Sequence, residues 1–246
     1  MRARRGLLFT GLTMFVVSAT HPVGAGGPWE AEAGAYGGST TGHMACGPDM
    51  RIAYGGGGGE VRYAGIRGAG ASQGFAFDAG ALAEYERAWP TSCNSNSGCG
   101  NDAWSGVAPS ARARVGYDWS WFGFRLGAIL WSQPQTLRGI QLLPVPDLAL
   151  RFGSLDAIRL AVGFGAYDLP TYLRPGLYGG LLFPSGGSDI GVYLGAHYSL
   201  ADSIALREAL TLRAPLSAHL WLRVDLALME SVDVGADAML GLGGDL

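Results

Sequence analysis

The chain has 246 residues, of which 41 are Gly, and its 17 basic and 20 acidic residues give a formal net charge of −3. Every basic residue is Arg, and removal of the first 25 residues would take away three of them, leaving 14 Arg against 20 carboxylates and a net charge of −6. A surface of that sign repels nucleic acid. After the amino-terminal segment no apolar run is long enough for a transmembrane helix.

The amino terminus is typical of a signal peptide. Residues 1–5 are basic, residues 6–19 are apolar, and Val23 and Ala25 occupy positions −3 and −1 of a cleavage site before Gly26. The apolar run is shorter than the roughly 20 residues that a membrane span requires. We therefore predict a signal peptide over residues 1–25 and an exported mature chain over residues 26–246.

The mature chain alternates apolar and polar residues with a period of two. Leu222, Val224 and Leu226 fall on one face of a segment, whereas Arg223 and Asp225 fall on the other. This period indicates a strand, not a helix. Twelve such segments are predicted, at residues 28–38, 50–67, 73–87, 106–118, 121–132, 146–152, 157–166, 176–183, 189–198, 203–213, 217–229 and 231–242.

Strands of this kind cross a bilayer only when every backbone group is paired in a closed sheet. The predicted fold is therefore all-β, a transmembrane antiparallel up-and-down β-barrel of about 12 strands. Long connections follow the odd strands, at residues 39–49, 88–105, 133–145 and 167–175, and short turns follow the even ones. This order weakens near the carboxyl end, where connections are short throughout, so a barrel of about 10 strands is the alternative.

The second predicted strand has two phases. Ile52 and Tyr54 keep one alternation, Val61 and Tyr63 keep the other, and five glycines at residues 55–59 lie between them. A change of phase within a strand is typical of a β-bulge or a bend. No Lys followed by Ser or Thr comes after the glycines, so a phosphate-binding loop is not indicated.

Cysteine usage agrees with an oxidising compartment. Cys93 and Cys99, in the segment CNSNSGC, are predicted to form a disulfide within an external loop. Cys46 has no evident partner, and with His43 it supplies at most half of a metal site. We expect no metal and no cofactor.

The polar face predicts a balanced set of charges inside the barrel. It comprises Arg62, Arg112, Arg114, Arg125, Arg151, Arg159, Arg207, Arg213 and Arg223 against Glu30, Glu32, Asp78, Glu84, Glu86, Asp118, Asp225, Asp233 and Asp237. Because a selective pore usually carries a ring of one sign, balance favours an ion-pair network that braces a mostly filled interior. Glycines on the same face leave room for water, so a narrow passive pore is the alternative.

One constellation suggests an enzyme. His197 and Ser199, in the segment AHYS, together with Glu208 on the next strand, resemble the His-x-Ser element and Glu of the lipid A deacylase barrels. The resemblance implies that His197 would take the Ser199 proton and Glu208 would orient His197. Leu200 and Ala201 follow here, where that family has Asn-Ala. By alternation Glu208 falls on the lipid face, which places it at the outer rim unless a bulge turns it inward.

The final strand resembles the carboxyl-terminal strand of bacterial outer-membrane β-barrel proteins. It carries Val232, Val234, Ala236, Ala238, Leu240 and Leu242 on one face, but the chain ends in Leu246 and not in an aromatic residue. The resemblance implies an integral outer-membrane protein in contact with lipid, with both termini in the periplasm and inserted by the barrel-assembly machinery. It also implies a structural scaffold with surface loops or a narrow passive pore, without catalysis. The oligomeric state stays open.

Overall fold

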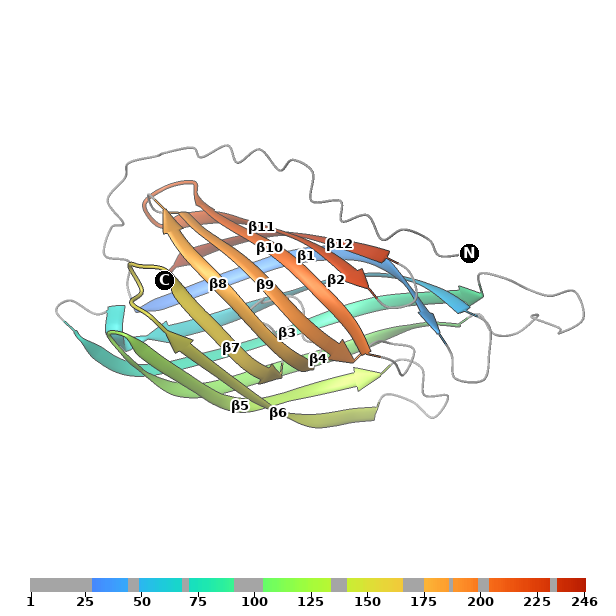
Figure 1. The fold of residues 1–246 in the computed structure, drawn as a ribbon, viewed down its shortest axis with the longest axis horizontal. Helices are drawn as coiled ribbons and strands as arrows, with labels where there is room; N and C mark the ends of the chain where they lie inside the picture. Colours follow the sequence, from blue (N-terminus) through green and yellow to red (C-terminus); the bar gives the residue numbers. More distant parts are fainter. Residues whose placement is uncertain are drawn as a thin grey trace, which may run out of the picture.

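The structure, a computed structural model, describes residues 28–43, 49–67, 71–90, 104–133, 141–165, 175–185, 188–198, 204–230 and 234–246. Within these ranges the chain forms one closed antiparallel barrel of twelve strands (Figure 1). No helix among the described residues is long and apolar enough to cross a membrane. The strands are β1(Trp29–His43), β2(Asp49–Ala64), β3(Gln73–Pro90), β4(Trp104–Trp119), β5(Phe122–Gln133), β6(Gln141–Phe152), β7(Arg159–Gly165), β8(Gly176–Ser185), β9(Ser188–Tyr198), β10(Ile204–Pro215), β11(Leu220–Glu230) and β12(Val234–Asp245).

Each strand pairs with its neighbours in sequence, and β1 closes the barrel on β12 from Glu30↔Asp245 to Ser39↔Ala236. The prediction of an up-and-down barrel of twelve strands is confirmed, and the alternative of ten strands is wrong. The short connections after β9 and β11 are sufficient for hairpins because antiparallel neighbours need only a few linking residues. The predicted leader, Cys46, Cys93, Cys99, Ser199 and Asp233 lie outside the described residues.

The two ends of the barrel differ. The turn end, as we call it, carries the first residue of β1, the last residue of β12 and the connections at residues 65–72, 120–121, 153–158, 186–187 and 216–219. A single turn of 3-10 helix, η1(Gly65–Arg67), belongs to the first of these. The loop end, opposite, carries the connections that follow the odd strands.

The predicted bulge in β2 is wrong. Its pairing with β1 runs without interruption from Trp29↔Tyr63 to His43↔Asp49, and its pairing with β3 is equally regular. Ile52 and Tyr54 are buried inside the barrel, while Val61 is exposed on the exterior. The apparent change of phase arises because apolar side chains occupy both sides of the wall, so the interior is not uniformly polar.

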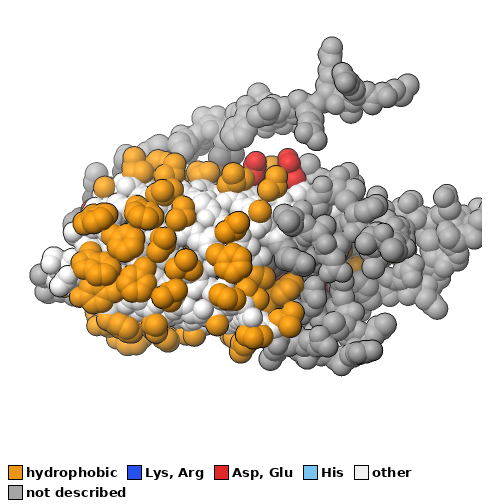
Figure 2. All heavy atoms as spheres, turned by 60° about the horizontal axis from the view of Figure 1, so that its bottom comes forward, with side chains coloured by type: hydrophobic (Ala, Val, Ile, Leu, Met, Phe, Trp, Pro, Cys, Tyr) orange, Lys and Arg blue, Asp and Glu red, His pale blue; other side chains and the backbone are white. Residues whose placement is uncertain are grey.

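The exterior is apolar, as hydrocarbon requires. Figure 2 shows hydrophobic side chains spread over the described part of one face of the wall. The large exposed apolar residues come from strands all around the barrel and include Phe75, Val115, Leu126, Phe164, Leu177, Val192, Leu194, Leu226 and Leu240. Aromatic rings meet at the turn end, where Trp29 lies 4.9 Å from Tyr63 and Trp119 lies 5.8 Å from Phe122 between ring centroids. Such a girdle marks a membrane interface.

Among the described residues, the first part of β6 pairs with only one neighbouring strand. Strand β6 pairs with β5 from Gln133↔Gln141 onward, but within the described ranges its pairing with the short β7 begins only at Leu148↔Phe164. Pro144 and Pro146 lie in this stretch, and proline is confined to strands that lack a partner on one side because it has no N–H to donate. The sequence reading placed residues 141–145 in a loop, whereas β5 holds them as a strand.

Glycines on the inner face make room for aromatic rings. A Cβ atom at Gly180 would overlap the ring of Tyr193, one at Gly163 would overlap that of Tyr178, and one at Gly243 would overlap that of Trp221. The alternative of a narrow pore places water in this space. In the structure aromatic side chains fill it, which allows a twelve-stranded barrel to have a packed interior.

This packing predicts opposite outcomes for two adjacent glycines. Gly180→Ala forces Tyr193 to move and should cost about 1–3 kcal/mol of stability through overpacking. Gly179→Ala is the matched control, since a Cβ there would meet only Val162 and Ala161, at 3.8 Å and beyond. The temperature at which the folded band on a detergent gel converts to the unfolded one should fall for Gly180→Ala only. Equal temperatures for both variants would contradict the packing described here.

Candidate functional site

An apolar cluster fills the interior, and we call it the plug. Its buried members come from eight strands and are Tyr36, Ile52, Tyr54, Ala88, Tyr178, Tyr193, Ala209, Ala227, Met229 and Met239. A second cluster joins Leu82 of β3 with Ile129 and Trp131 of β5, across the intervening β4. The most accessible plug residue, Tyr36, is only 9% exposed. Side chains that lined an open water channel would be exposed, so the interior is closed at this level.

Polar groups in and beside the plug form hydrogen bonds between strands. The Tyr54 hydroxyl lies 3.1 Å from Asp237 Oδ2 and 3.1 Å from Met229 Sδ, and Arg207 donates to the same Asp237 carboxylate at 2.7 Å. The Tyr36 hydroxyl donates to Glu84 at 2.5 Å. Paired polar groups are tolerated in a closed interior, whereas unpaired ones are costly.

A buried ion-pair network lies between the plug and the turn end. Asp78 accepts a hydrogen bond from Arg114 at 2.7 Å and also lies 3.6 Å from Arg112 and 3.8 Å from Arg125. Glu60 accepts from Arg112 at 2.5 Å and from Arg62 at 2.6 Å. These contacts join β2, β3, β4 and β5, so the network braces one side of the barrel.

The opposite wall carries its own set of contacts. Arg223 pairs with Asp225 at 3.0 Å and with Glu32 at 3.4 Å, and the indole N–H of Trp221 donates to Glu32 at 3.4 Å. The guanidinium group of Arg213 stacks on Trp221, with its carbon 3.6 Å from the ring centroid. Stacking and pairing together fix these long side chains against β1, β10 and β11.

Between the two walls lies a cavity of about 190 Å³, which we call the arginine chamber. Its charged lining consists of eight arginines and four carboxylates, namely Arg62, Arg67, Arg114, Arg125, Arg151, Arg159, Arg213 and Arg223 with Glu30, Asp78, Asp118 and Asp189. Tyr178 and Tyr193 of the plug also line it. The exposed fraction of the side chain falls from 29% at Asp189 to 2% at Arg114. The chamber therefore opens toward the turn end and is closed by the plug.

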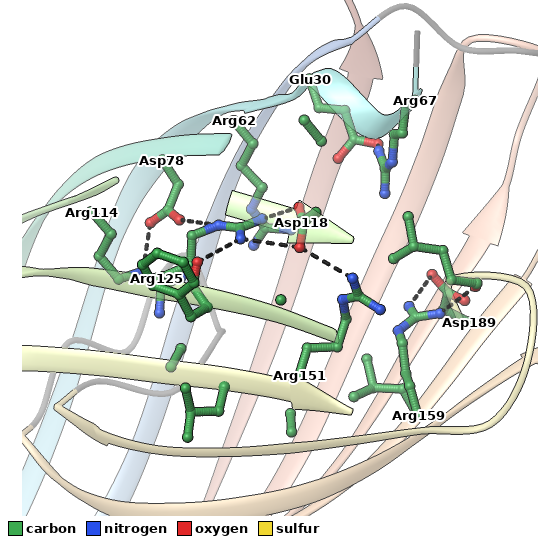
Figure 3. A pocket seen from close by; sticks show the side chains of 18 of the residues that line it. Glu30, Arg62, Arg67, Asp78, Arg114, Asp118, Arg125, Arg151, Arg159 and Asp189 are labelled. Atoms are coloured by element: carbon green, nitrogen blue, oxygen red, sulfur yellow. Dashed lines mark hydrogen bonds and ion pairs between the residues drawn. The ribbon is translucent and has the colours of Figure 1, made fainter. Parts of the chain in front are cut away.

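Carboxylates at the rim of the chamber are shared between arginines. Asp118 pairs with Arg125 at 2.7 Å and with Arg151 at 3.2 Å, so it lies between the two guanidinium groups (Figure 3). Glu30 likewise pairs with Arg213 and Arg67, and Asp189 pairs with Arg159 at 3.3 Å.

Burial, with the nearby charge of Arg213, lowers the pKa of Arg67 in η1 to about 10. Its guanidinium group still carries a positive charge at neutral pH.

The structure places the predicted interior charges of the described residues inside the barrel. It adds four that the sequence reading missed, Glu60, Arg67, Asp147 and Asp189. Glu60 is missed because the sequence suggests a change of phase in β2, which leaves the inner face of that stretch undefined. Asp147 lies at the start of the predicted strand, directly after the segment predicted as a loop. The arginines of the chamber lie toward the turn end together with Glu30, Asp78, Asp118 and Asp189, while Glu84, Glu86 and Asp237 lie toward the loop end with Arg207.

The described residues do not bring His197 and Glu208 together. His197 is buried inside the barrel opposite Ala205, whereas Glu208 is exposed on the exterior between Leu194 and Leu228. Since the pairing of β10 is regular on both sides, no bulge turns Glu208 inward. Within the described ranges no three His, Cys, Asp or Glu side chains are arranged to hold a metal ion.

Comparison with known proteins identifies the fold but no family. No family model matches the sequence, and no curated protein matches it. The structure is similar to the translocator domain of autotransporter NalP from Neisseria meningitidis, with a TM-score of 0.53 and 11% identity over 90% of this chain and 89% of that one. It also matches a KdgM porin, with a TM-score of 0.46 and 13% identity over 87% of this chain and 99% of that one. The similarity to the translocator domain, together with the closed barrel, confirms the predicted resemblance to bacterial outer-membrane barrels at the level of the fold.

The ion-pair network predicts a strong effect of one charge removal. Asp78→Asn leaves Arg112, Arg114 and Arg125 without their shared carboxylate and should destabilise the barrel by about 3–5 kcal/mol. Asp156→Asn is the control, because Asp156 is an exposed acidic residue in the turn between β6 and β7. Urea unfolding in lipid vesicles, followed by tryptophan fluorescence, measures both. A change of less than 1 kcal/mol for Asp78→Asn would be incompatible with a bracing role.

Proposed function

We propose that this protein is an integral outer-membrane barrel that acts as a closed scaffold for its loop-end connections, not as an open passive pore. The burial of plug side chains from eight strands carries this proposal. The apolar exterior and the closed wall support insertion into a bilayer. The proposal assigns no catalytic step to the barrel, and the opposite orientations of His197 and Glu208 support that part of it.

We further propose that residues 1–25 are a signal peptide, that both termini and the turn end face the periplasm, and that the barrel-assembly machinery inserts the chain among outer-membrane lipids. The basic and apolar leader sequence supports the first part. Short turns at the end that carries both termini support the second, because barrels of this class have short periplasmic turns. A disulfide between Cys93 and Cys99 in the connection after β3 belongs to the same proposal.

An epitope inserted between Ser217 and Ala218 tests the orientation. These residues are exposed in the turn between β10 and β11, so an insertion there should leave the strands intact. In cells of a Gram-negative host, antibody should bind only after the outer membrane is permeabilised. Binding to intact cells would place the turn end at the cell surface and contradict the proposal.

Conductance in planar bilayers tests whether the barrel is closed. The wild-type protein should show no step-like openings, because the plug leaves no continuous water path. Tyr54→Ala combined with Tyr193→Ala removes rings from opposite parts of the wall, β2 and β9, and should produce small openings. This double variant also demonstrates that inserted barrels are detected. Regular openings of the wild-type protein would overturn the scaffold in favour of the pore.

A further inference from the structure

The charge at the rim of the arginine chamber is not balanced. Five rim arginines, Arg67, Arg125, Arg151, Arg159 and Arg213, pair with only three carboxylates, Glu30, Asp118 and Asp189. The deeper Asp78 carboxylate is held by Arg114 at 2.7 Å and lies 3.8 Å from the nearest rim arginine. Asp245, the last residue of β12, adds a fourth negative charge near Arg67, so the rim holds one positive charge more than its carboxylates neutralise.

Two of the three carboxylates are shared, which shows how the excess arises. Asp118 serves Arg125 and Arg151, and Glu30 serves Arg67 and Arg213, so each pair of guanidinium groups has one anionic partner. A like-charge group of this kind is unfavourable in a partly buried cavity unless an anion joins it. The planar guanidinium groups are suited to an oxyanion, because each can donate two parallel hydrogen bonds to the oxygens of a phosphate or carboxylate group.

We propose that the arginine chamber binds a small oxyanion of the phosphate class. The cavity of about 190 Å³ is large enough to admit such a small ligand. Because the chamber lies inside the wall and opens toward the turn end, the anion enters from the aqueous compartment there and not from a lipid leaflet. Tyr178 and Tyr193 of the plug form the floor of the site.

The proposal is independent of whether the plug ever opens. A barrel that conducts could still bind phosphate at its rim, and a closed barrel could fail to bind it. A failure of the conductance prediction therefore does not decide the prediction of anion binding, and the reverse also holds.

Calorimetric titration of the folded, detergent-purified chain with inorganic phosphate at low ionic strength tests the site. Wild-type protein should bind saturably, and added sodium chloride should weaken binding by screening. Arg67→Gln combined with Arg159→Gln leaves three rim arginines against four carboxylates and so removes the excess of positive charge. Loss of two charge-assisted contacts should weaken phosphate binding at least about tenfold.

A matched control removes the same charge elsewhere. Arg51 and Arg87 are exposed on the loop-end half of β2 and β3, and Arg51→Gln combined with Arg87→Gln should change the affinity by less than about twofold. Asp189→Asn raises the excess at the rim and should tighten binding. This third variant decides the question if the first does not fold, because its side chain lies at the accessible rim.

Absence of saturable phosphate binding by the folded wild-type chain would overturn the proposal. So would equal loss of affinity in the chamber variant and its control, which would indicate a general effect of net charge. Unchanged or weaker binding by Asp189→Asn would do the same.

Discussion

A strand that faces hydrocarbon must find a partner for every backbone N–H and C=O, and this constraint organises the whole molecule. Pairing of β1 with β12 meets it by removing both edges of the sheet. Once the wall is closed, side chains can only point outward to lipid or inward to the lumen. The outward set is apolar around the barrel, and Pro144 and Pro146 are placed where β6 lacks a second partner among the described residues. Closure of the barrel thus determines whether the side chain at each position faces lipid or the interior.

The lumen that closure creates is then filled. Glycines on β7, β8 and β12 allow the rings of Tyr178, Tyr193 and Trp221 to approach the opposite backbone, so small residues in one strand support large ones in the next. This arrangement resolves the ambiguity of a glycine-rich inner face, which by composition alone suits water and aromatic packing equally. Dispersion contacts and hydroxyl hydrogen bonds stabilise the plug, while the buried arginine and carboxylate pairs join strands that lie close together in the wall, as Arg112 of β4 and Glu60 of β2 do.

Most of the interior charge lies toward the turn end of the barrel, where arginines and carboxylates pair, and the total is nearly balanced. Arginines dominate the turn end, where water has access, and their carboxylates are shared; acidic residues such as Glu84 and Asp237 lie toward the loop end, each tied to a neighbouring side chain. A bracing network needs only opposite charges in contact. The surplus of arginine at an accessible rim is a feature that bracing does not require, and for that reason it indicates a binding site.

Period-two alternation, the leader and the order of long and short connections determined the architecture from the sequence alone, because closure in a membrane leaves a strand pattern few alternatives. They also placed most charged residues on the inner face, since each strand alternates. Only the tertiary structure decided what the interior contains. The regular register of β2 turned Ile52 and Tyr54 inward, and pairing with β5 extended β6 back to Gln141. Asp118 and Glu30 each pair with two arginines from other elements of the barrel. The spacing of residues along the chain does not encode the distances between side chains inside the barrel.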